Sequence, residues 1–188
     1  IMSHRLVWCC AFVMLWLAMH GQLRGVSRAL RNPAVRGRLV ATALLISFNW
    51  TLFVWAVEQG RVVEASLGYF INPLINVLLG IWVVGERLNR VQWLAVALAA
   101  AGVGYLTWWS GAAPWIALGL GISFSVYGLI RKLAPVDAVT GLAAETVLLA
   151  PFALGFLLWL ALTGQGAWGH AGGFINVLLV AGGLITAL

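Results

Sequence analysis

Charged residues are scarce in this sequence. They make up 9% of its 188 residues, and only five side chains are acidic. A soluble domain usually has about 25% charged residues, so this chain has too little polar surface to coat a water-soluble globule. The only cysteines, Cys9 and Cys10, are adjacent, which excludes a disulfide-stapled secreted domain and a cysteine-rich zinc site.

Apolar residues are abundant instead, at 63% of the chain, and they occur in long runs. Seven apolar stretches lie at residues 4–21, 37–58, 63–85, 91–109, 114–131, 139–162 and 173–188. Most approach the roughly 20 residues that a helix needs to cross a bilayer, and none shows the alternation of a barrel strand. The sequence therefore predicts an all-α integral membrane protein, a polytopic helix bundle with seven visible spans.

The basic residues predict how these spans are oriented. The first loop contains no acid and carries five arginines: Arg24, Arg28, Arg31, Arg36 and Arg38. The positive-inside rule places this loop in the cytoplasm and makes its arginines topology determinants. The net charge of +6 then reflects orientation in a bilayer rather than nucleic-acid binding. No amphipathic surface helix is evident, although residues 22–38 can rest on the inner headgroups through their arginines.

Both ends of the chain predict a fragment. The sequence starts at Ile1 without a signal peptide, although the topology puts this residue outside, and it stops at Leu188 within an apolar run. We therefore expect truncation at both ends, with at least one helix missing before residue 1; the alternative is a genuine seven-helix protein.

The span at 63–85 carries unusual polar residues. Glu64, Gly68, Asn72 and Asn76 recur every four residues and so share one helix face. That face is expected to point inward, because an amide in hydrocarbon is unfavourable unless it is hydrogen-bonded. Pro73 is expected to bend the helix. The alternative is that the asparagines only hold helices together.

Other spans hold candidate polar contacts. Asn49 beside Trp50 can line an amphipathic solute pocket, or it can be a satisfied amide in a packed core. Tyr127 is either a cavity residue or an interfacial tyrosine. Glu145 lies inside a span and must be neutral, paired or hydrated there. It can carry a coupling proton, contact a substrate amine, or snorkel to the headgroups.

Motifs of catalysis are absent from the sequence, which has no GxSxG, Walker or HExxH pattern. The three histidines lie near span ends, where an interfacial position is expected. We therefore predict no catalytic residues, no metal ligands and no cofactor.

Several stretches resemble a known family. The run EASLGYFINPL, the following GE and the WLAVALA span resemble the EamA-type drug/metabolite transporters, and more narrowly the RarD subfamily. That resemblance implies ten helices in two inverted five-helix repeats. Residues 1–110 would be the end of the first repeat and residues 111–188 the start of the second, with the first helix and the last helices missing.

In that fold the solute is held between the repeats near the middle of the membrane. The family motif that the sequence resembles includes Tyr69, Asn72 and Pro73. The other candidates are chosen because they are polar or aromatic residues at some depth within a span. The predicted substrate-binding residues are Asn49, Trp50, Tyr69, Asn72, Tyr127 and Glu145, with Pro73 as a helix bend.

We therefore expect a multi-pass secondary transporter of the inner (plasma) membrane. It would move a small amphipathic metabolite or drug-like solute by alternating access, and it would not be an enzyme. Its expected partners are the solute and the lipid bilayer, not nucleic acid, and the sequence predicts no oligomeric state. The alternatives are an integral-membrane enzyme and a non-transporting membrane scaffold.

Overall fold

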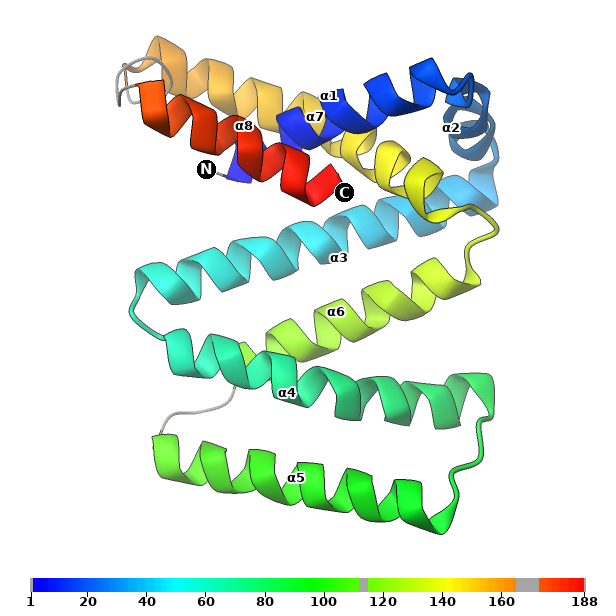
Figure 1. The fold of residues 1–188 in the computed structure, drawn as a ribbon, viewed down its shortest axis with the longest axis vertical. Coiled ribbons are helices and arrows are strands. Elements are labelled where there is room, and N and C mark those ends of the chain that lie inside the picture. The colour runs from blue at the N-terminus through cyan, green and yellow to red at the C-terminus, as the bar shows by residue number, and fades with distance from the viewer. Residues whose placement is uncertain (1, 112–114, 165–172, 188) are drawn as a thin grey trace. The chain divides into compact units, whose positions relative to one another are not determined.

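The computed structural model describes residues 2–111, 115–164 and 173–187, and within these ranges the chain forms helices and no strand (Figure 1). The α-helices are α1 Met2–Met19, α2 Leu23–Arg31, α3 Pro33–Glu58, α4 Val62–Leu79, α5 Arg90–Ser110, α6 Trp115–Leu133, α7 Ala138–Leu162 and α8 Gly173–Ala187. A π-helical turn, η1 Gly80–Val84, extends α4. The predicted all-helical fold is confirmed.

Six helical segments of the described chain are long and apolar enough to cross a membrane: α1, α3, α4 with η1, α5, α6 and α7. The seventh predicted stretch corresponds to α8, which is apolar but shorter. Helices are the expected solution because lipid offers no hydrogen-bond partner for a free backbone N–H or C=O.

Local sequence signals fix several helix ends. Asn89 starts α5 with a capping box: its side chain accepts from the Gln92 N–H at 2.8 Å, and the Gln92 side chain accepts from the Asn89 N–H at 2.9 Å. Asp137 caps α7 by accepting from the Thr140 N–H at 2.9 Å. Gly111 follows α5 with a left-handed φ of 62°, the conformation that glycine adopts most readily.

The arginine-rich first loop is more ordered than the sequence predicted. Residues 23–31 form the separate helix α2, and α3 starts at Pro33 rather than near residue 37. Asn32 separates them, and its Oδ1 accepts from the N–H groups of Ala34 and Val35 at the start of α3. Nine residues are too few to form a stable helix alone, so α2 depends on packing that a single sequence does not reveal.

The chain divides into two compact units. We call residues 1–43 with 134–188 the discontinuous unit, and residues 44–133 the continuous unit; α3 contributes to both. The predicted division into repeats at residue 110 stays a prediction, because a repeat is defined by its second copy and not by compactness.

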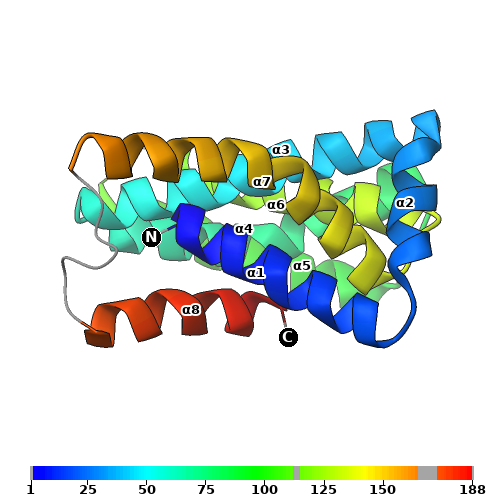
Figure 2. The ribbon, with the colours of Figure 1, turned by 90° about the horizontal axis from the view of Figure 1, so that it is seen from above.

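In the discontinuous unit α1 packs against both α7 and α8, and α2 packs against α7 (Figure 2). Small and branched apolar side chains fill the core between these helices and the start of α3. The buried members are Cys9, Val13, Leu17, Val26, Ala29, Val35, Leu39, Ala143 and Ala144.

In the continuous unit α6 lies between α4 and the second part of α3, and α5 packs on α4 (Figure 1). A Cβ added at Gly68 of α4 would lie 2.9 Å from the Leu120 Cβ and 3.2 Å from the Ala117 carbonyl oxygen of α6. Glycine therefore permits the close approach of these two helices, as small residues do in membrane bundles.

Candidate functional site

Asn49 connects α3 to α6 in the continuous unit. Its side chain is buried, and its Nδ2 donates to the Leu120 carbonyl and to the Ser123 Oγ, each at 2.9 Å. Both donor hydrogens of the amide can therefore be used between helices. This geometry supports the packed-core alternative for Asn49.

Asn72 lies on α4 and contacts α6 as well, and its side-chain oxygen is the atom that accepts hydrogen bonds. The Ser125 Oγ donates to the Asn72 Oδ1 at 2.6 Å, and the Asn76 Nδ2 donates to the same oxygen at 3.3 Å. Among the residues that the structure describes, the Asn72 Nδ2 has no acceptor. Asn72 is half-buried, and its two N–H groups can still donate hydrogen bonds.

Tyr69 lies one turn before Asn72 and therefore on the same side of α4. Its side chain is 66% exposed, and its ring meets the Phe53 ring edge-on at 6.0 Å between centroids. Asn76, one turn after Asn72, is exposed as well. We call Tyr69, Asn72 and Asn76 the α4 strip.

The predicted inward face of α4 is confirmed in part. Glu64 is buried, Gly68 contacts α6, and Asn72 is bonded to Ser125, whereas Asn76 is exposed. The four-residue spacing drifts around a helix of 3.6 residues per turn, so the last member of the series leaves the interface.

Trp50 and Tyr127 are half-buried and belong to the same unit as Asn49 and Asn72. Trp50 follows Asn49 on α3, and the Tyr127 ring lies 5.9 Å from the Phe124 ring on α6. Pro73 lies inside α4, which continues to Leu79, and the bend predicted there stays a prediction.

Glu145 belongs to the discontinuous unit, where it is 2% exposed. Its Oε1 accepts from the Thr42 Oγ1 at 2.7 Å, a contact between α7 and α3. The sequence named no partner for this carboxylate. Thr42 lies seven residues before Asn49, two helical turns earlier on the same face of α3, and this spacing is the one sequence signal that could have pointed to it.

A second buried carboxylate, Glu64, lies at the start of α4. Arg61 holds it with two hydrogen bonds, Nε to Oε1 at 2.6 Å and Nη2 to Oε2 at 2.7 Å. The Arg61 guanidinium also lies 5.2 Å from the Trp115 ring centre. This ion pair and cation–π contact connect the α3–α4 turn to the start of α6.

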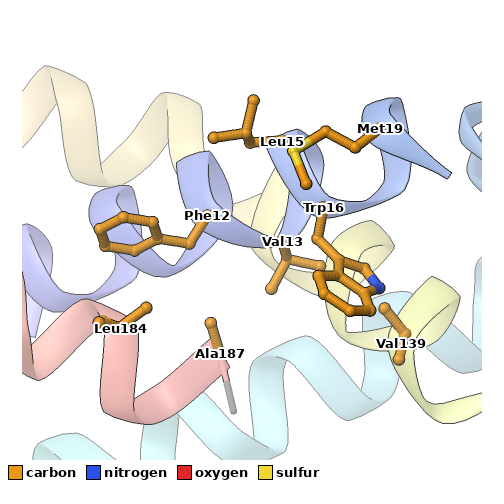
Figure 3. A pocket seen from close by; sticks show the side chains of 8 residues that line it. All are labelled: Phe12, Val13, Leu15, Trp16, Met19, Val139, Leu184 and Ala187. Atoms are coloured by element: carbon orange, nitrogen blue, oxygen red, sulfur yellow. The ribbon is translucent and has the colours of Figure 1, made fainter.

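An apolar cavity of about 370 Å³ lies in the discontinuous unit (Figure 3). Its lining side chains come from α1, α7 and α8: Phe12, Val13, Leu15, Trp16, Met19, Val139, Leu184 and Ala187. None of the predicted substrate-binding residues is among them. Within the described ranges no cluster of three metal-binding side chains occurs.

Comparison with known proteins adds the following. The family model of EamA-like transporters matches residues 1–108. The chain is 44% identical over 188 residues to protein RarD of Salmonella typhi and covers 64% of that relative. It is 44% identical over 190 residues to an uncharacterized transporter of Vibrio cholerae, of which it covers 62%. Both alignments cover all of this chain.

A third relative is the chloramphenicol-sensitive protein RarD of Pseudomonas aeruginosa. It is 36% identical over 164 residues, which cover 85% of this chain and 55% of the relative. The chain thus spans less than two thirds of the length of each of these three relatives. No solved structure matches it.

Proposed function

Because this chain belongs to the EamA-like transporter family, we propose that the full-length protein moves a small amphipathic metabolite or drug-like solute by alternating access. The chain itself is a multi-pass protein of the bacterial inner membrane. The transport activity is assigned to the full-length protein, since the chain covers only part of its relatives' length.

The observation that carries the proposal is the α4 strip. It presents an exposed aromatic ring and the Asn72 amide within an apolar span. Placing an exposed amide against acyl chains costs free energy, because hydrocarbon offers it no hydrogen bond. A polar strip in a span is therefore expected to face protein, water or a solute. An apolar surface with a few placed polar groups is also typical of small-molecule sites.

The remaining predicted residues take supporting roles in this proposal. Asn72 donates a hydrogen bond to an acceptor on the solute, and Tyr69 contacts the solute's apolar body. Trp50 and Tyr127 supply further contacts, while Asn49 positions α6 through its two bonds. Pro73 permits α4 to bend as the solute is exposed to alternate sides.

Glu145 is proposed as the group that couples transport to protons. Its carboxylate is buried and bonded to the Thr42 hydroxyl, which can donate to the ionised form or accept from the protonated form. A buried carboxylate with a partner that serves both protonation states suits a site that gains and loses a proton.

The test uses the full-length protein in proteoliposomes and measures uptake across a panel of amphipathic metabolites. For the solute that is transported, Asn72→Ala is expected to raise KM about fivefold to tenfold, because a neutral hydrogen bond contributes about 1 kcal/mol. Ser125→Ala leaves the Asn72 donor in place and is expected to raise KM less. Transport with an unchanged KM in Asn72→Ala would contradict the proposed contact.

A further inference from the structure

We propose that the discontinuous unit binds an anionic phospholipid of the inner leaflet. The headgroup lies against the arginines of α2, and one acyl chain enters the apolar cavity formed by α1, α7 and α8. This site is separate from the α4 strip and does not depend on the proposed solute.

The first observation is the division of α2 into two faces. Arg24, Arg28 and Arg31 are exposed and lie within about 60° of one another at 100° per residue. Val26 and Ala29 are buried on the opposite side, in the core of the unit. The helix is therefore anchored by its apolar face and presents its guanidinium groups outward.

The second observation is the charge around this face. Glu58 is the first acidic residue of the chain, so α1, α2 and the first part of α3 contribute no acid, and Asp137 at the start of α7 is the acidic residue that lines the groove beside Arg28. Arg36 and Arg38, both exposed, extend the positive charge into α3. A basic amphipathic helix on the cytoplasmic side is complementary to anionic lipid headgroups.

A groove of about 320 Å³ runs between α2 and the first turn of α7, and it adds headgroup chemistry. Arg28, Asn32, Asp137 and Thr140 are among its lining residues. Arg28 can bind the phosphodiester, and the Asp137 carboxylate, whose Oδ2 already accepts from the Thr140 N–H, can accept further hydrogen bonds from headgroup hydroxyls. This combination selects a phospholipid that is anionic and carries hydroxyl groups, such as phosphatidylglycerol.

The apolar cavity supplies the place for the acyl chain. It extends along α1 from Phe12 to Met19, and only residues 20–22 separate Met19 from α2 (Figure 3). Val139 lines the apolar cavity and Thr140 lines the polar groove, so consecutive residues of α7 contribute to both. A phospholipid matches this arrangement, because its charged headgroup is followed by an apolar acyl chain as the polar groove is followed by the apolar cavity.

The test measures lipid binding to the purified full-length protein by native mass spectrometry with phosphatidylglycerol or phosphatidylcholine. We expect phosphatidylglycerol to bind at least fivefold more tightly. Replacing Arg24, Arg28 and Arg31 with glutamine should weaken it at least tenfold and leave phosphatidylcholine unchanged. The control variant, with Arg87 and Arg90 changed to glutamine in the continuous unit, should bind as the wild type does.

A second arm tests the acyl chain with Leu184→Trp, which fills the cavity. This variant should weaken phosphatidylglycerol binding at least threefold while its melting temperature stays within a few degrees of the wild type. Dibrominated acyl chains should quench fluorescence in the wild type more than in Trp16→Phe, because bromine would reach the Trp16 ring.

Four results would overturn the proposal. The first is equal binding of the two lipids, and the second is a loss of phosphatidylglycerol binding in the control variant as large as in the α2 variant. The third is full competition by soluble glycerol 3-phosphate, and the fourth is quenching that does not depend on Trp16. The third result would assign the site to a free phosphate rather than to a lipid.

Discussion

At the scale of single residues, the contact between Thr42 and Glu145 shows how this apolar chain accommodates a carboxylate. Glu145 is buried, and the Thr42 hydroxyl lies 2.7 Å from its Oε1. A buried polar group that loses its partner is penalised more than the bond itself contributes, because the group then remains desolvated and unsatisfied.

Replacing Thr42 with valine should therefore destabilise the protein by about 1 kcal/mol or more, since valine keeps the shape and removes the donor. Thr42→Ser keeps the hydroxyl and should retain most of the stability. Thermal unfolding of the full-length protein in detergent measures both. A valine variant that melts at the wild-type temperature would show that this hydrogen bond contributes nothing to stability.

The sequence identified the polar residues of the spans but not their partners. Glu145 is conspicuous as an acid inside an apolar run, whereas Thr42 lies 103 residues away and is unremarkable in a span. Asn49 and Asn72 are both predicted to contact the solute, and the structure shows that their side chains are bonded in different ways. The Asn49 Nδ2 is bonded to α6, whereas Asn72 is held through its oxygen.

At the scale of helices, α4 and α6 approach closely at Gly68, where a larger side chain would meet α6. Gly68 has Leu120 and Ala117 of α6 within 3.2 Å of where its Cβ would be. Gly102 of α5 is also helical, yet a Cβ there would meet nothing within 4 Å. The two glycines thus form a matched pair.

Gly68→Ala should destabilise the protein by about 1–3 kcal/mol, because the new methyl forces α4 and α6 apart. Gly102→Ala should be neutral or slightly stabilising, because alanine favours helix over glycine. Chemical or thermal unfolding of both full-length variants measures the difference. Equal effects of the two substitutions would contradict the close approach at Gly68.

Helix positions were more predictable than helix contacts. The apolar runs predicted α1 and α3 to α7 within a few residues at most ends, because hydrophobicity over about 20 residues is a strong signal. The α2 helix was not predicted as a separate element. Its nine residues owe their stability to Val26 and Ala29 packing in the core of the discontinuous unit.

At the scale of the whole molecule, the arginine-rich segment carries the predicted orientation and the buried carboxylate carries the proposed coupling. All five arginines of residues 24–38 are exposed on α2 and the first turns of α3. Their place between the first two spans fits the positive-inside prediction that this side faces the cytoplasm.

Proton coupling through Glu145 predicts a specific pH dependence of transport. Solute flux through the wild-type full-length protein should change with pH as the Glu145 carboxyl gains or loses a proton. Glu145→Gln carries a permanently neutral amide, so its flux should be nearly independent of pH over the same range. A pH profile that is the same in both proteins would refute coupling at this residue.

The account rests most on solute contact at the α4 strip, and cysteine labelling measures this directly. With Cys9 and Cys10 replaced, Tyr69→Cys and Phe70→Cys place a thiol at neighbouring exposed positions, of which only residue 69 belongs to the strip. The transported solute should slow maleimide labelling of residue 69 in a saturable manner and leave residue 70 unaffected. Equal protection of both positions, or protection of neither, would contradict the account.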